Sequence, residues 1–169
     1  MQMQISTDYA IRILQYLHEN GNGEELHTAM HIAQAIGITY PFFIKIANLL
    51  KQRGLICAVQ GRNGGYRITG PAHEVSVYDV YLCMEGALQI NRCFKSEDEP
   101  CTNGNKEDCK VRGFLSRLQN DVIIAEMSKK KIADLIHAGE GSAEKNCHPN
   151  SSATDKDLQR LQDHFNATA

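Results

Sequence analysis

Residues 38–69 of the chain read ITYPFFIKIANLLKQRGLICAVQGRNGGYRIT, and most of the fold can be predicted from this stretch. Thr39 can cap a helix that continues to Gln52. Pro41 stands in the first turn of that helix, where the N–H that proline lacks would have no helical partner anyway. Gly54 follows the helix, and glycine is the residue that most often ends one. The stretch therefore begins with a helix.

The second half of the stretch predicts a β-hairpin. Residues 55–59 and 66–69 are short runs with the β-branched and aromatic side chains that favour strands. Between them lies Gly61-Arg62-Asn63-Gly64-Gly65, and its Asn-Gly pair favours a tight turn. We therefore expect two antiparallel strands joined by a glycine-rich, basic turn.

A helix-turn-helix is expected before the hairpin. Apolar residues recur at helical spacing from Ser6 to Glu19, and Thr28 can cap a second helix that Gly37 closes. Residues 38–39 alone separate the second helix from the third, which is typical of a helix-turn-helix. A helix-turn-helix followed by a basic hairpin indicates a winged helix. The fold class is mainly α with a small β-hairpin.

The chain changes character after a fourth helix, which Ser76 can cap and which extends to Met84. Residues 91–109 are polar and contain three cysteines, so we expect a loop. A narrow apolar stripe of coiled-coil type follows over residues 110–127, and it predicts a dimerisation helix. Ser128 is expected to begin a short last helix through Ile136. The expected dimer-interface residues are Val111, Phe114, Leu118 and Val122.

The chain thus divides into four expected parts. They are a winged helix-turn-helix DNA-binding domain, a cysteine cluster loop, a dimerisation helix with the short last helix, and a flexible tail, at residues 1–85, 86–109, 110–137 and 138–169 respectively.

Charge is distributed unevenly along the chain. The net charge is −2 and the pI is about 6.4, yet residues 39–70 contain five basic residues and no acidic one. A segment without acids favours a polyanionic partner over a merely solvated surface, and we expect that partner to be a double-stranded DNA operator. The expected DNA contacts are Thr28, Thr39, Tyr40, Phe42, Lys45, Lys51, Arg53, Arg62 and Asn63.

Three cysteines point to a soft metal. Cys93, Cys101 and Cys109 stand in the polar loop with seven residues between each pair. Thiolates are ligands of iron–sulfur clusters and of zinc, but the CxxC pairs typical of zinc are absent from the sequence. No signal peptide and no apolar run long enough for a membrane span are visible, so we expect a cytoplasmic protein without a membrane partner.

These features together resemble the Rrf2 family of winged-helix transcription regulators, over roughly residues 1–137. The resemblance rests on Thr7-Asp8-Tyr9-Ala10, on Ile44-Lys45-Ile46, on the glycine-rich turn at 61–65 and on the three-cysteine loop. It implies a homodimer that binds palindromic operators, with long helices that cross between subunits and a cysteine loop close to the DNA-binding half. The iron–sulfur members of the family, of the NsrR, IscR and RirA types, are the most similar.

The resemblance also suggests a fourth cluster ligand. IscR-like members have a histidine three residues after the last cysteine, where this chain has Arg112. NsrR-like members use an aspartate in the first helix of the partner subunit, and Asp8 matches it. A carboxylate near a helix start can also be there because the helix dipole favours it. The family more commonly has five residues between cysteines. We expect a [4Fe-4S] cluster rather than a [2Fe-2S] cluster.

The expected function is therefore operator binding that an iron–sulfur cluster switches in response to nitric oxide or redox stress. One alternative within the same class is control of iron or iron–sulfur cluster homeostasis. From another class, the chain could be an iron–sulfur electron carrier or a zinc-binding interaction protein. No nucleophile with a base and no phosphate-binding glycine loop is visible, so we do not expect an enzyme.

Overall fold

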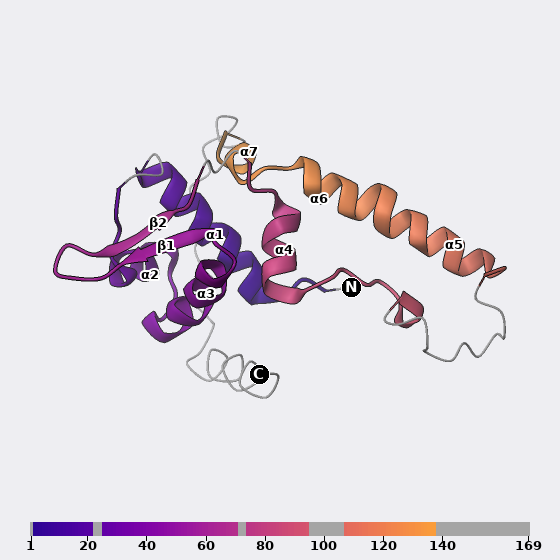
Figure 1. Cartoon of the computed structure of the whole chain (residues 1–169), viewed down its shortest axis with the longest axis horizontal. Helices are drawn as coiled ribbons and strands as arrows, with labels where there is room; N and C mark the ends of the chain where they lie inside the picture. The colour runs from indigo at the N-terminus through magenta and orange to yellow at the C-terminus, as the bar shows by residue number, and fades with distance from the viewer. Residues whose placement is uncertain (1, 22–24, 71–73, 95–106, 138–169) are drawn as a thin grey trace.

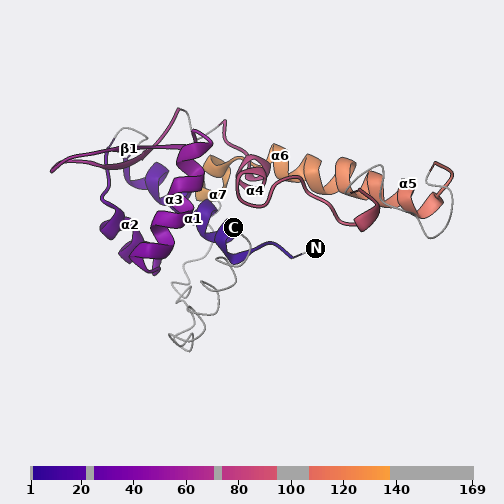
Figure 2. The ribbon, with the colours of Figure 1, turned by 60° about the horizontal axis from the view of Figure 1, so that its bottom comes forward.

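The structure is a computed structural model, and it describes residues 2–21, 25–70, 74–94 and 107–137. It consists of a body, which is a winged helix, and an arm that extends away from it (Figures 1 and 2). The body contains α1 (Ile5–Gly21), α2 (Ala29–Ile36), α3 (Tyr40–Gln52), β1 (Ile56–Val59), β2 (Gly65–Ile68), α4 (Val77–Glu85) and α7 (Ile132–His137). The arm contains the 3₁₀ turn η1 (Arg92–Phe94) and a long helix made of α5 (Lys110–Arg117), η2 (Leu118–Ile124) and α6 (Ala125–Lys129).

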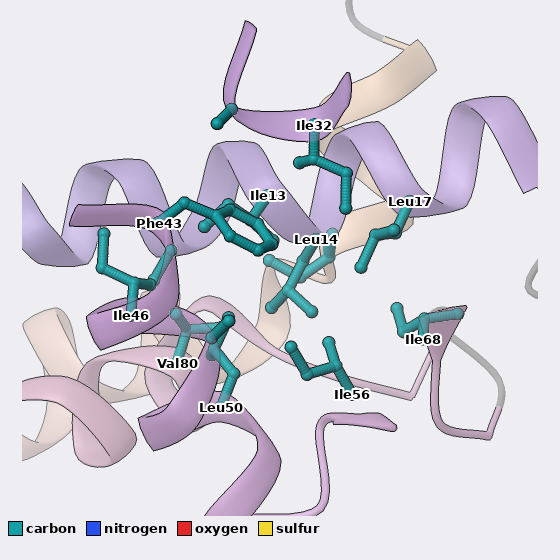
Figure 3. Packing of buried hydrophobic residues seen from close by; sticks show 14 of the residues in the cluster. Ile13, Leu14, Leu17, Ile32, Phe43, Ile46, Leu50, Ile56, Ile68 and Val80 are labelled. Carbon is teal, nitrogen blue, oxygen red and sulfur yellow. The ribbon is translucent and has the colours of Figure 1, made fainter. Parts of the chain in front are cut away.

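The mainly helical fold with one β-hairpin confirms the predicted fold class. The apolar stripe of α1 is fully buried and packs against the apolar faces of α2, α3 and the hairpin (Figure 3). The central side chains of this core are Ile13, Leu14, Leu17, Ile32, Phe43, Ile46, Leu50, Ile56, Ile68 and Val80.

The turn between α2 and α3 has the geometry of a helix-turn-helix. Gly37 adopts a left-handed conformation with φ 73°, and the N–H of Ile38 donates to the carbonyl of Ala33 at 2.9 Å. The two helices meet at 109°, which lies within the usual range for this motif. Among the described helices, none alone is long and apolar enough to cross a membrane, although the bent α2–α3 pair meets that test when taken together.

The hairpin is fastened to the body through a third extended segment. β1 and β2 pair antiparallel with Ile56 opposite Ile68. His27 adds an isolated bridge to Tyr66, with N–H to carbonyl distances of 2.9 and 2.8 Å in the two directions. The backbones approach so closely here that a Cβ on Gly65 would lie 2.6 Å from the His27 carbonyl oxygen. This contact requires glycine at position 65.

The long helix differs from the prediction in its middle. The segment η2 is a π-helix, whose hydrogen bonds join residues five apart, so the expected regular spacing of the stripe is interrupted after Leu118. The expectation that Ser128 begins the last helix is also wrong. Ser128 belongs to α6, and the chain becomes extended at Lys130, because the backbones of Lys130 and Ile132 pair with Val77 and Val75. The predicted tail, residues 138–169, lies outside the described residues.

The close approach at Gly65 gives a first prediction. Gly65→Ala places a Cβ against the His27 backbone and should lower the free energy of unfolding by about 1–3 kcal/mol. Gly113→Ala is the matched control, since no described atom lies within 4 Å of its added Cβ and alanine favours a helix by about 0.5–1 kcal/mol. Urea denaturation of both variants checks this. Equal or higher stability of Gly65→Ala would show that the wing does not pack as described.

Candidate cysteine site and DNA-binding surface

Two of the three predicted cysteine ligands belong to the arm. Cys93 is in the η1 turn, and Cys109 is the residue that caps α5. Both are free thiols and half-buried. Cys101 lies outside the described residues. One end of the cysteine loop is joined to the long helix through Ile90, and the other end begins that helix at Cys109.

Cys109 is placed where its sulfur faces peptide N–H groups. Its Sγ accepts a hydrogen bond from the backbone N–H of Arg112 at 3.4 Å. This hydrogen bond fixes the sulfur at the N-terminus of α5. Arg112, the residue that stands where IscR-like members have histidine, thus contributes its backbone to this cysteine.

Cys93 is held by polar contacts that sequence analysis missed. The N–H of Ile90 donates to Oε1 of Gln119 in the long helix at 3.0 Å. The N–H of Cys93 donates to Oδ1 of Asn91 at 3.4 Å. The helical spacing alone could have shown that Gln119 lies off the apolar stripe, but its partner depends on the loop conformation.

Asp8 lies in the first turn of α1, and its Oδ2 is 2.8 Å from Nε of Arg12. Both side chains are 49% exposed, so this ion pair contributes about 0.3–0.5 kcal/mol. The same turn is held from α4, because Glu85 Oε1 accepts from the Gln4 N–H at 2.9 Å and from the Thr7 hydroxyl at 2.5 Å. The α1 turn is therefore fixed while the Asp8 carboxylate remains accessible.

One subunit does not bring Asp8 to the cysteines. In the described ranges, no three His, Cys, Asp or Glu side chains are grouped so that they could hold a metal ion. α1 lies in the body, whereas η1 and the start of α5 lie far out on the arm (Figures 1 and 2). Within one subunit, the two described ends of the cysteine loop therefore lie away from the DNA-binding half.

The donors that are present fit a group that takes soft sulfur ligands. Cys93 and Cys109 are free thiols of intermediate burial; Cys109 caps the long helix, and the turn that contains Cys93 is joined to the same helix through Ile90. By contrast Cys83 is half-buried in α4, and burial raises the pKa of its thiol, so it forms a thiolate less readily. Cys57 lies in β1 of the wing, and Cys147 lies outside the described residues.

The predicted DNA contacts lie on α2, α3 and the wing, and one of them has to be corrected. Phe42 is only 8% exposed and packs edge-to-face on Tyr9 with ring centroids 5.7 Å apart. It is a core residue and is not available to DNA, since both Phe42 and Phe43 face inward under α1. Tyr40 at the start of α3 is 46% exposed, and Lys45 is half-buried one turn further along.

The remaining predicted contacts are on the surface. Thr28 caps α2, its hydroxyl accepting from the His31 N–H at 3.3 Å, whereas Thr39 stands at the cap position of α3 but its side chain forms no capping bond to a described residue. The exposed residues of the set are Thr28, Thr39, Tyr40, Lys51, Arg53, Arg62 and Asn63. Sequence analysis missed Asn48, which is exposed three residues after Lys45 on the outer side of α3.

The wing and the start of α3 lie side by side. Tyr66 of β2 packs edge-to-face on Phe43 with centroids 5.2 Å apart, and burial, with a smaller contribution from Tyr40, raises the pKa of Tyr66. The hairpin therefore packs beside α3, and its turn extends outward from the body (Figure 1).

The predicted dimer residues are unusually exposed for apolar side chains. Val111 is 65% exposed, Phe114 58% and Val122 51%, while Leu118 is half-buried. The long helix stands clear of the body in both views (Figures 1 and 2). No described part of the same chain covers these side chains.

The sequence of the chain matches a known protein family. The model of the Rrf2 family, described as an iron-dependent transcriptional regulator, matches residues 3–138. The chain belongs to the Rrf2 family. Rrf2 membership confirms the resemblance inferred from the sequence.

The chain is also similar in sequence to individual proteins. The chain is 37% identical to protein aau3 of Rhizobium meliloti (strain 1021) over 101 residues, which are 60% of this chain and 64% of that protein, slightly less than two thirds of its length. It is 30% identical to the HTH-type transcriptional regulator NsrR of Shouchella clausii (strain KSM-K16), over 68% of this chain and 75% of that one.

A solved structure agrees in fold. The global cysteine regulator CymR of B. subtilis matches with a TM-score of 0.65 at 17% identity, over 82% of this chain and 98% of that chain. The two NsrR relatives are named as HTH-type transcriptional regulators and not as enzymes.

Proposed function

We propose that this chain is a dimeric, DNA-binding transcription regulator of the cytoplasm whose operator affinity is switched by an iron–sulfur cluster. The observation that supports this most directly is the arrangement of the arm. One helix anchors both ends of the cysteine loop and also exposes Val111, Phe114 and Val122 to solvent. A second copy of the helix would cover these apolar side chains and bring its own body close to the cysteines.

In this proposal Cys93, Cys101 and Cys109 of one subunit and Asp8 of the other hold the cluster. When bound, a cluster of the [4Fe-4S] type supplies a centre that reacts with nitric oxide and oxidants. Asp8 would exchange its half-exposed pairing with Arg12 for iron, which costs little. Cys109 contributes a sulfur that already faces the N-terminus of α5.

A ligand on α1 is well placed to affect DNA binding. Asp8 is followed along α1 by Ile13 and Leu14, which are fully buried against α3. Because packed interiors transmit displacement, a change in the position of α1 in one subunit shifts the recognition helix beside it. Binding of a cluster between subunits would thus favour one spacing of the two recognition helices over another.

The signal we favour is nitric oxide or redox stress, because a regulator named NsrR covers two thirds of the chain at 30% identity and Asp8 matches its type. Iron or iron–sulfur homeostasis is the second candidate, and the family description, an iron-dependent regulator, favours it. An electron carrier would lack specific operator binding. A zinc-binding interaction protein would purify with zinc and without colour.

The cluster proposal predicts distinct behaviour of the cysteines. Changing Cys93, Cys101 or Cys109 to Ala should abolish the visible absorbance of anaerobically purified protein, while Cys57→Ala and Cys83→Ala, the matched controls, should retain it. Asp8→Ala should still assemble a cluster that decays faster in air, because a ligand is lost. Asp8→Cys should decay more slowly, since a thiolate is the better ligand for iron.

Two outcomes would contradict this. If the air-decay traces of wild type and Asp8→Ala superimpose, Asp8 is only a helix-end carboxylate, which would contribute about 0.3–1 kcal/mol to stability. If the three cysteine variants keep wild-type absorbance, the loop is not the cluster site.

The dimer proposal predicts that Phe114→Asp yields monomers. In the dimer, a carboxylate in the apolar stripe of the long helix would lose its hydration without gaining a partner. Asn120→Asp introduces the same charge at an exposed polar position of the same helix and should leave the protein dimeric. Analytical ultracentrifugation distinguishes the two, and operator binding should fall with dimerisation. A dimeric Phe114→Asp protein would place the interface elsewhere.

The DNA proposal predicts a loss of binding in Lys45→Ala. If Lys45 contacts a base, operator affinity should fall by about 1–3 kcal/mol while non-specific binding changes little. If it contacts phosphate, binding to all sequences should weaken and the salt slope should fall by about one. Lys129→Ala on the arm removes the same charge and serves as control. If both variants bind DNA like wild type in fluorescence anisotropy titrations, Lys45 is not part of the DNA-binding surface.

A further inference from the structure

The π-helical segment in the middle of the arm coincides with a contact to the cysteine loop. η2 extends over Leu118–Ile124, between two α-helical segments. π-helices are rare, usually a single turn long, and frequent at functional sites. The second residue of this segment is Gln119, which is half-buried rather than exposed.

Gln119 connects the long helix to a distant part of the chain. Its Oε1 accepts the backbone N–H of Ile90 at 3.0 Å, across 29 positions of sequence. Ile90 is also half-buried and precedes the η1 turn. The bond therefore joins the segment that leaves the body after α4 to the long helix, which leads back to the body.

Further hydrogen bonds continue from Ile90 to Cys93. The Asn91 side chain accepts from the Cys93 N–H at 3.4 Å, and its carbonyl accepts from the Phe94 N–H at 3.1 Å. The Gln89 amide donates to the Phe94 carbonyl at 3.4 Å. The short turn that contains Cys93 is thus closed on itself and is fastened to the long helix at Ile90.

The second cysteine is fixed to the same helix by a different means. Cys109 caps α5 with its own Sγ. At 1.5 Å of rise per residue, Cys109 and Gln119 are separated by about 15 Å along the helix axis. The helix therefore determines where both described thiols stand, one through its N-terminus and the other through Gln119.

We propose that Gln119 is a positioning residue that sets the place of Cys93 relative to Cys109. The proposal rests on the proposed function, since the two thiols matter together as ligands of one cluster. A glutamine at this position offers a carbonyl oxygen to the Ile90 N–H, whereas an apolar residue of the same size leaves that N–H without its partner. Without the bond, the Cys93 turn is no longer fastened to the helix at Ile90.

The test compares three variants. Gln119→Leu keeps the size of the side chain and removes the acceptor, and Gln119→Glu keeps an acceptor oxygen. Asn120→Leu is the matched control, because the Asn120 amide donates to Ser116 within the helix and not to the loop. Two measurements are made on each full-length protein.

The first measurement is amide hydrogen exchange in protein from which metal has been removed. We expect the Ile90 amide to exchange roughly three- to tenfold faster in Gln119→Leu than in wild type, with Gln119→Glu and Asn120→Leu close to wild type. The second is the decay in air of the visible absorbance of anaerobically prepared protein. We expect faster decay and an altered visible circular dichroism spectrum in Gln119→Leu alone.

Each outcome has one meaning. Wild-type exchange at Ile90 in Gln119→Leu overturns the proposal, because the bond then does not hold the turn. Faster exchange with wild-type decay and spectrum also overturns it, since the contact would be structural and would not position a ligand. Wild-type protein that binds no iron and sulfide is the failure of the proposed function instead, and it is recognised before any variant is compared.

Discussion

The arrangement of the whole molecule depends on the place where the arm returns to the body. The N–H of Ile132 donates to the Val75 carbonyl and the N–H of Val77 donates to the Lys130 carbonyl, each at 2.9 Å. Ile132 is fully buried in the core and opens α7, which packs on α1. Because the chain leaves the body after α4 and must return beside the start of α4, the intervening residues form an arm that extends out and back. Cys93, Cys109 and the exposed apolar side chains of the long helix are consequently on the arm and outside the body.

The interactions that involve α1 differ in strength. The buried apolar side chains fix α1 against α3, and Glu85 fixes the first turn of α1 from α4. The Asp8–Arg12 pair, in contrast, is half-exposed and contributes little to stability. If Asp8 serves as a cluster ligand as proposed, this division would let it leave Arg12 without unfolding the turn, while the buried part of α1 would pass a displacement on to α3.

The body could be predicted from sequence because its determinants are local. Gly37 closes α2, Pro41 stands in the first turn of α3, and Ser76 caps α4, all as expected, and the structure adds Asp79 as the partner of Ser76 in a capping box. The arm could not be predicted to the same depth, because its determinants are non-local. The end of α6 is set by pairing with residues 75–77, and the η2 segment coincides with the contact of Gln119 to Ile90.

The candidate site shows the same limit. Phe42 was among the predicted DNA contacts, but it is buried, because the ring of Tyr9 on α1 covers it, and a contact between two helices does not follow from helical spacing alone. The thiols of Cys93 and Cys109 were recognisable by composition, whereas the N–H groups and side chains that hold them depend on tertiary contacts. The position of Cys101, and the other subunit that would supply Asp8, lie beyond the described residues.

The central claim is that a dimer of this chain holds one cluster per subunit. Native mass spectrometry of anaerobically purified protein tests it most directly, because it records the number of chains and the bound atoms in one spectrum. We expect a dimer whose excess mass corresponds to two [4Fe-4S] clusters. After exposure to nitric oxide, this excess mass should be lost, and the protein should be found as a dimer without clusters or as monomers. A dimer that carries zinc or no metal, or a monomer that carries a cluster, would contradict it.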